Sequence, residues 1–284
     1  MPEYKKVGYL TDSFKMFHLK DTKRREFGYH YHDFHKILIL LSGNVSYTIE
    51  GHTYDLLEDD IVLVNAGEVH KPVIHSDTPY ERIIIYVSPD FLEEYGEEEN
   101  NLTRCFHQAR ARHSHVLRRR PARNSRLNTV LRELDRSLTD TDYAGALYHR
   151  VLFLEFMIQL NRAALHDQLQ FIGDSTSNEK ILSILSYLNT HLTEDLCIDE
   201  LSARFFLSRY HLMHTFKEQT GYTIGSYLSA KRLLLARELI AAGTPITDAC
   251  YACGFRNYST FARAYKKSFG ESPREHRQSS LSVN

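Results

Sequence analysis

Near the carboxyl end of the chain, polar, basic and aromatic residues recur twice at helical spacing. The first set is Arg209, Tyr210, Met213, His214 and Lys217, and the second is Tyr258, Ser259, Thr260 and Arg263. Residues three or four positions apart share one face of a helix, so each set predicts one exposed face. Side chains of these types suit nucleic acid, because polar groups read base edges and basic groups hold phosphates. Arg263 is the candidate for guanine, since its fork can pair with O6 and N7 together.

Each set follows a short apolar segment and a tight turn. Residues 199–208 lead into the first set, and residues 246–255 lead into the second, about 49 residues later. The inward positions of the second segments are spaced i, i+4: Leu212 with Phe216, and Phe261 with Tyr265. A helix-turn-helix buries one side of its second helix in this way and frees the other for a DNA groove. A single stripe would be interpreted as a solvated helical face, but two tandem units predict DNA binding.

A long apolar segment between the two units predicts the element that holds them. It runs from Thr223 to Ala242, after Gly221, and ends at Gly243-Thr244-Pro245. A helix of about 20 residues spans roughly 30 Å, close to the ~34 Å of one duplex turn. One rod could therefore hold two reading helices over successive major grooves.

The charge distribution favours the same interpretation. The net charge of −1 hides an asymmetry: residues 1–100 hold 10 Lys+Arg against 19 Asp+Glu, and residues 177–284 hold 13 against 10. The last stretch concentrates the basic residues Arg256, Arg263, Lys266, Lys267, Arg274 and Arg277. Such a local basic face is what phosphate contact requires.

Residues 181–277 resemble the DNA-binding domain of the AraC/XylS family of bacterial transcription regulators. The resemblance is carried by Leu207-Ser208, Leu212, Phe216-Lys217, Gly221, Tyr227 and Arg232-Leu233, then by Gly254-Phe255-Arg256-Asn257-Tyr258, Phe261, Tyr265-Lys266-Lys267-Ser268-Phe269-Gly270 and Pro273. It implies base contacts at Tyr210, Met213 and His214, a helix cap at Ser208, and phosphate contacts at Arg209 and Lys217. In the second unit, Asn257 is the expected cap, and Lys266 and Lys267 lie toward the phosphates. Three residues depart from the family pattern: Phe206, Tyr265 and His276.

The amino-terminal part predicts a different fold. Short β-branched runs at 37–41, 45–49, 61–64 and 82–87 are separated by turn residues, as in a small barrel or sandwich. From about residue 101 the period becomes helical, and a helix from Tyr143 to Ala164, capped at Thr141-Asp142, is apolar on most sides. The fold class is therefore α+β. We expect a cupin-like sensor domain at 1–100, a helical coupling and dimerisation region at 101–176, and an all-α DNA-binding domain at 177–284.

Histidines in the strand region could carry chemistry of their own. His30 and His32, Lys36, and later His70 keep the spacing of the two cupin motifs, which this region resembles. Cupin metal sites use a glutamate where Lys36 stands, and an ammonium beside a divalent ion is repulsive. Asp59 and Asn65 also replace a glycine and a proline of the motifs. Three interpretations stay open: a three-histidine metal site, a pocket for an organic effector with Lys36 facing an anion, or ordinary polar residues.

Together these features predict a ligand-responsive transcription regulator, with an activator favoured over a repressor. Its partners would be double-stranded DNA, a small-molecule effector and a second copy of the chain through the helix at 143–164. We expect no cofactor, no catalytic residues, no membrane partner and a cytoplasmic location. Cys250 and Cys253 are expected to be buried helix residues rather than metal ligands. The rival hypotheses are a metal-dependent cupin oxygenase or isomerase with an accessory domain, and a regulator with a vestigial barrel.

Overall fold

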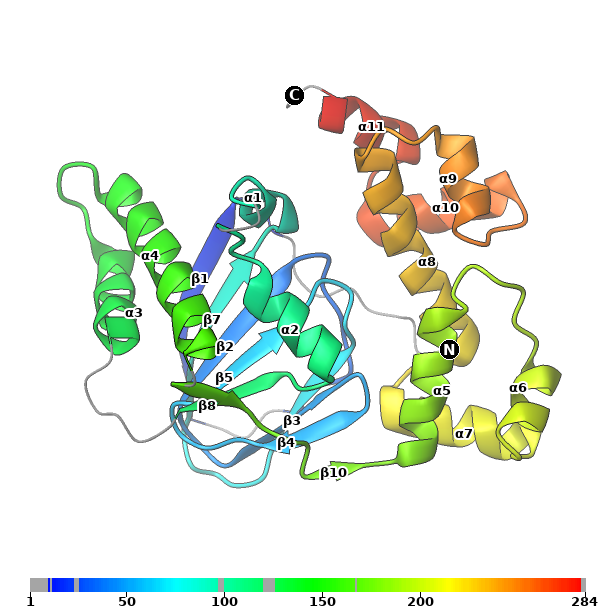
Figure 1. Ribbon diagram of the computed structural model, residues 1–284, viewed down its shortest axis with the longest axis horizontal. Coiled ribbons are helices and arrows are strands. Elements are labelled where there is room, and N and C mark those ends of the chain that lie inside the picture. The colour runs from blue at the N-terminus through cyan, green and yellow to red at the C-terminus, as the bar shows by residue number, and fades with distance from the viewer. Residues whose placement is uncertain are drawn as a thin grey trace. The chain divides into compact units, whose positions relative to one another are not determined.

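The computed structural model describes residues 10, 12–22, 26–96, 100–119, 126–166 and 168–281 (Figure 1). Its contacts divide the chain into two compact units. Of the described residues, the sheet unit holds those from Leu10 to Phe27 together with those of Phe34–Thr176. The helical unit holds Gly28–Asp33 together with the residues from Ser177 onward. The predicted fold class is confirmed, with a sheet-rich amino-terminal part and a helical carboxyl-terminal part.

Two sheets build the sheet unit. The larger has the order β1-β7-β2-β5-β8-β9 and the smaller β10-β4-β3-β6. The strands are β1 (Phe14–Asp21), β2 (His35–Ser42), β3 (Val45–Ile49), β4 (His52–Asp55), β5 (Ile61–Val64), β6 (His70–Ile74), β7 (Tyr80–Val87), β8 (Val116–Arg119), β9 (Leu169–Phe171) and β10 (Thr176–Ser177). All four predicted strands are present, and the sequence did not indicate β1, β4, β6 or the last three.

The alternation of side chains explains the continuous apolar runs of the central strands. In β2, Leu38 and Leu40 join the core between the two sheets, whereas Ile37 and Ile39 join the core on the opposite face. Successive residues of a strand point to opposite faces, so a run without polar residues means that both faces are covered. The second face is covered by helices (Figure 1).

Four helices supply that cover: α1 (Pro89–Glu93), α2 (Arg104–Arg112), α3 (Arg126–Arg136) and α4 (Gly145–Leu165), with a 3-10 turn η1 (Ser137–Thr139) after α3. The predicted cap of α4 at Thr141-Asp142 is wrong, since the N-cap is Ala144, at φ +57° and with no side-chain cap. The contacts place residues 101–176 in one unit with the strands rather than in a region of their own, because β8 and β9 complete the larger sheet.

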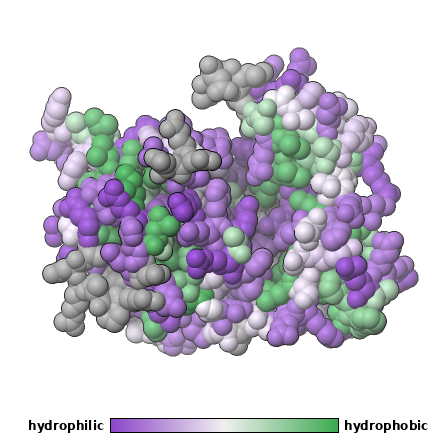
Figure 2. All heavy atoms as spheres, in the orientation of Figure 1, coloured by the Kyte–Doolittle hydropathy of each residue, from purple (hydrophilic) through white to green (hydrophobic). Residues whose placement is uncertain are grey.

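The surface of α4 is unusual for an amphipathic helix. Its inner side is buried through Phe153, Phe156 and Leu160, yet Leu147 and Val151 are 62% and 52% exposed. Apolar residues reach the surface over this helix (Figure 2). The described residues contain no helix that is both long and apolar enough to cross a bilayer.

The helical unit is organised around α8 (Ile224–Ala241), close to the predicted rod. The other helices are α5 (Glu179–Thr190), α6 (Ile198–Arg204), α7 (Arg209–Thr220), α9 (Ile246–Ala252), α10 (Tyr258–Phe269) and α11 (Pro273–Leu281). Towards its carboxyl end α8 packs Leu233, Ala236 and Ile240 against α9 and α10. Near its start, Tyr227 stacks edge-on with Phe216 of α7 at 5.7 Å and donates a hydrogen bond to Asn189 of α5. The two helix-turn-helix units therefore sit at the two ends of one helix (Figure 1).

Candidate nucleic-acid interface and effector site

The first reading helix, α7, is fixed at both ends and along its inner face. Ser208 Oγ accepts a hydrogen bond from the backbone N–H of His211 at 3.2 Å, which is the predicted cap. Gly221 ends the helix at φ +75°, a conformation that favours glycine. Leu212 and Phe216 are fully buried. Burial of these two residues leaves only the opposite face of α7 for a partner.

The second reading helix, α10, repeats this construction. Asn257 Oδ1 accepts a hydrogen bond from the backbone N–H of Thr260 at 3.0 Å, and Gly270 ends the helix at φ +79°. Phe261 and Tyr265 are fully buried against α8. Cys250 and Cys253 pack in the same core, and burial raises the pKa of the Cys253 thiol to about 12.

All thirteen residues predicted to serve DNA binding are exposed. They are Ser208, Arg209, Tyr210, Met213, His214, Lys217, Asn257, Tyr258, Ser259, Thr260, Arg263, Lys266 and Lys267. The rings of Tyr210 and His214 stack at 5.6 Å, and Arg263 Nε donates to the Ser259 carbonyl one turn earlier. Arg209 is paired with Asp199 of α6, a contact that the sequence did not indicate. The two sets are thus available to a ligand, and their individual contacts to DNA stay predictions.

The turns of the two helix-turn-helix units each contain a residue with positive φ, but the residue types differ. Gly254 has φ +83°, and a Cβ there would lie 2.6 Å from the Thr193 carbonyl oxygen. The first turn has Phe206 at φ +53°, with 91% of its surface exposed. A bulky residue with positive φ costs roughly 1–2 kcal/mol, which this turn tolerates because no neighbour crowds the side chain.

Arg232 of α8 connects two loops of the helical unit. Its guanidinium donates to the carbonyls of Leu192 at 2.7 Å, Gly254 at 3.0 Å and Glu194 at 2.6 Å. Three carbonyls from two loops are held by one planar group, which a lysine could not do with the same geometry. Arg232 is therefore a positioning residue for the second turn and for the loop between α5 and α6.

In the sheet unit, Lys36 is a buried basic group inside an apolar core. It lies on the same side of β2 as Leu38 and Leu40, which face the space between the sheets. Its Nζ donates to the Tyr47 hydroxyl at 2.9 Å and lies 3.5 Å from His70 Nε2. His70 Nδ1 lies 2.9 Å from the Glu68 carbonyl, so Nδ1 carries the proton and Nε2 offers its lone pair to Lys36.

The surroundings of Lys36 favour its neutral form. Burial, followed by the nearby charge of Arg82, lowers the pKa of Lys36 to about 7. Within the described part of the chain, no carboxylate forms an ion pair with this amine. A buried amine without a counter-ion is costly, so it marks a site where an anion would be stabilised.

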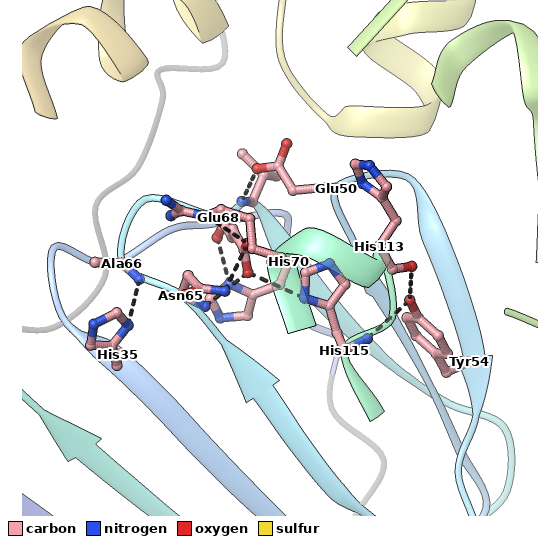
Figure 3. A network of polar contacts seen from close by, with 11 residues as sticks. His35, Glu50, Tyr54, Asn65, Ala66, Glu68, His70, His113 and His115 are labelled. Atoms are coloured by element: carbon pink, nitrogen blue, oxygen red, sulfur yellow. Dashed lines mark hydrogen bonds and ion pairs between the residues drawn. The ribbon is translucent and has the colours of Figure 1, made fainter. Parts of the chain in front are cut away.

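A polar network borders this site (Figure 3). The Glu68 carboxylate accepts from the backbone and side-chain N–H groups of Asn65, at 2.8 and 3.0 Å, and lies 3.4 Å from His115 Nδ1. Asn65 thus shapes the turn before β6. Asp59 adopts φ +70°, which suits the glycine that it replaces in the motif. These two departures from the cupin pattern preserve the turns.

The three predicted histidines are divided between the two compact units. His30 and His32 belong to the helical unit, whereas His70 belongs to the sheet unit. A three-histidine metal site therefore stays a prediction. His35 is buried, stacks on Phe106 at 4.4 Å, and accepts a hydrogen bond from the backbone N–H of Ala66 at 3.2 Å. Burial lowers its pKa to about 3, so His35 is a neutral structural residue.

The fold and the exposed surfaces define a class of protein: a DNA-binding regulator with a tandem helix-turn-helix reader and a separate sheet-rich sensor. Residues 201–279 match a family described as "Helix-turn-helix domain", and residues 17–156 match "AraC-like ligand binding domain". The chain belongs to the AraC family of transcription regulators.

Similar proteins span nearly the whole chain. The HTH-type transcriptional activator RhaS of Citrobacter koseri is 25% identical over 250 residues, which is 88% of this chain and 87% of that protein. RhaS of Klebsiella pneumoniae is 26% identical over 259 residues, with the same two shares. Among solved structures, ToxT from Vibrio cholerae aligns with 94% of this chain and 98% of its own, at 16% identity and a TM-score of 0.38.

The His35 environment predicts how stability depends on pH. The unfolded chain binds a proton here below the ordinary pKa of 6.5, but the folded chain binds one only below about 3. Unfolding therefore takes up a proton in this window, and stability should fall as pH is lowered through it. We expect His35→Gln to flatten the slope of the urea midpoint between about pH 4.5 and 6.5. The exposed His75→Gln serves as control, and an unchanged slope in His35→Gln would contradict the assignment.

Proposed function

We propose that this regulator is an activator that reads DNA with α7 and α10 and responds to a small anionic effector bound between its sheets. The observation that carries the DNA-binding part is the pairing of two capped helices. Each buries one apolar face on α8 or its neighbours and exposes the complete predicted contact set. The activator assignment is supported by the function of the RhaS relatives.

The proposed contacts divide by chemistry. Tyr210, Met213 and His214 read bases from α7, with Arg209 and Lys217 on phosphates. From α10, Tyr258, Ser259, Thr260 and Arg263 face the groove, with Lys266 and Lys267 on phosphates. To contact a phosphate, the Arg209 guanidinium must either break its ion pair with Asp199 or bind the carboxylate and the phosphate at the same time. Ser208 and Asn257 contribute through their caps, because their side-chain oxygens already accept hydrogen bonds from the backbone.

The proposed effector group comprises Lys36, His70 and Tyr47. The sequence indicated the first two, and Tyr47 is added by its 2.9 Å contact with the amine. An anion bound there would pair with the protonated amine and restore its pKa upward. His30 and His32, the other predicted pocket residues, lie in the helical unit and are not part of this proposal.

We further propose that the chain forms a homodimer through α4, because its exposed apolar residues need a partner. A dimer would present four reading helices to paired sites. A DNA target supports the expected cytoplasmic location. The rival hypothesis of a metal-dependent enzyme is disfavoured by Lys36, whose amine occupies the position of a metal-binding carboxylate.

Arg263→Ala should relax base preference at one position by about 1–3 kcal/mol, because a bidentate pair to guanine is lost. Lys266→Ala should instead weaken all duplexes equally and reduce the salt slope by about one. Both effects are measured by titrating duplexes selected from a random library, at several fixed salt concentrations. Arg263 leaves the reading set if its variant keeps the native preference.

Lys36→Met should raise the melting temperature near pH 7 and remove the response to an anionic effector. The methionine fills similar space without a buried amine, and a true ligand stabilises the native chain by mass action. Thermal shifts of the full chain would be recorded with a panel of carboxylate and phosphate metabolites, uncharged sugars and divalent metals. A metabolite that stabilises both chains equally would refute the role of Lys36.

Val151→Glu combined with Leu147→Glu should convert the dimer to a monomer, because two carboxylates would be buried in an apolar interface. Sedimentation velocity measures the change, and Arg162→Glu, at an exposed position near the other end of α4, is the control. If the native chain already sediments as a monomer at micromolar concentration, the dimer proposal is wrong.

A further inference from the structure

The segment Gly28–Asp33 belongs to the helical unit although strands of the sheet unit flank it in the chain. It lies between β1, which ends at Asp21, and β2, which begins at His35. We call this segment the clasp. Its residues Tyr31 and His32 are each only 2% exposed. His30 Nδ1 lies 2.8 Å from the Gly28 carbonyl oxygen and forms a hydrogen bond within the clasp.

The amino-terminal end of the clasp packs against the carboxyl-terminal end of α7. The Tyr222 hydroxyl donates to the carbonyl oxygen of Tyr29 at 2.8 Å. Tyr29 also packs on Gly221, where an added Cβ would lie 2.6 Å from the Tyr29 Cβ. Gly221 is therefore required for two reasons: its φ of +75° and the close approach of Tyr29. The first reading helix ends directly on the clasp.

The second end of the clasp reaches α8 and the end of α10. Asp33 forms an ion pair with Arg237 of α8. The same guanidinium lies over the ring of Phe269, the last residue of α10, at 4.9 Å. Tyr31 forms a hydrogen bond with the side chain of Ser268, also in the last turn of α10. The clasp thus contacts the carboxyl-terminal ends of both reading helices.

The contacts of the clasp leave the DNA-facing residues uncovered. Tyr210 is 74% exposed and Arg263 is exposed as well, since both lie in the earlier turns of their helices. A seated clasp is therefore compatible with DNA binding. Together with α8, the clasp therefore connects the two reading helices. One end of the clasp contacts Gly221, at the end of α7, and its other end reaches Phe269, at the end of α10.

We propose that the clasp is an intramolecular docking element that sets the placement of α7 relative to α10 and so favours simultaneous engagement of two DNA half-sites. The proposal rests on the proposed DNA-binding function. Preorganisation of two contact groups lowers the cost of binding both at once but changes neither contact by itself. The clasp should therefore matter for a duplex with both half-sites and not for a duplex with one.

The position of the clasp in the sequence also suggests how a sensor could act on it. Asp33 is three residues before Lys36, a span of roughly 10 Å of extended chain. Lys36 is the proposed effector contact, and Asp33 holds the clasp on Arg237. A change at the start of β2 is thus transmitted to the clasp through a short continuous backbone.

The test uses a series at Asp33, because these substitutions leave the helical core unchanged. Asp33→Arg places two guanidinium groups together, Asp33→Asn removes the charge, and Asp33→Glu retains it. The full chain is titrated with a duplex selected by the native protein and with the same duplex in which one half-site is randomised. Hydrogen exchange at residues 29–32 reports whether the clasp is seated.

We expect Asp33→Arg to speed exchange in the clasp and to lose roughly tenfold in affinity for the complete duplex, the size of one hydrogen bond to a charged group. Affinity for the half-randomised duplex should stay native, and Asp33→Glu should resemble the native chain. Tyr251→Phe, in α9 outside the clasp, is the control. Faster exchange with native affinity for both duplexes, or unchanged exchange in Asp33→Arg, overturns the proposal. If the native chain selects no duplex, the DNA-binding proposal itself fails.

Discussion

The burial of α8 is the constraint on which the reader depends. This helix is apolar on opposite sides, with Tyr227 and Leu228 buried near its start and Leu233, Ala236 and Ile240 buried further along. Such a helix is stable in water only if other elements cover it from several directions. The two helix-turn-helix units supply that cover, and in doing so each receives a fixed position. Recognition geometry is therefore a consequence of core formation rather than a separate property of the reading helices.

In the sheet unit, too, burial of the core restricts which residues can be accommodated. Its central strands are buried on both faces, which leaves almost no room for polar groups in β2 and β5. His35 and Lys36, at the start of β2, are the exceptions, and Tyr47 and His70 contact the Lys36 amine without neutralising it. A core that stays folded around an uncompensated amine retains free energy that a bound anion can recover. This is the physical ground for our proposal that Lys36 serves an anionic effector.

The sequence predicted the local features well and the long-range ones poorly. The caps at Ser208 and Asn257 and the bounds of α8 followed from residue types a few positions apart. The cap of α4 was wrong because a left-handed Ala144 has no signature in composition. β1 was not indicated, since Lys15, His18 and Lys20 occur on both faces and break any alternation of apolar and polar residues. Its order comes from pairing with β7. The partners of Arg232 and of Asp33 lie far away in sequence, so no local pattern could reveal them.

The short distance in sequence between Asp33 and Lys36 gives the sensor and the reader a common element. Phe34 and His35 lie between them, and both are buried in the sheet unit. The segment therefore cannot absorb a shift at Lys36 by fraying, because two of its side chains are fixed by packing. Under the proposed coupling, a ligand that favours one position of this segment also favours the corresponding state of the clasp. The same relation holds in reverse, so the proposal predicts that DNA that selects the seated clasp alters the affinity of the sheet unit for its effector. Effector affinity measured with and without DNA thus reports the coupling directly, and equal affinities would mean that the two units act independently.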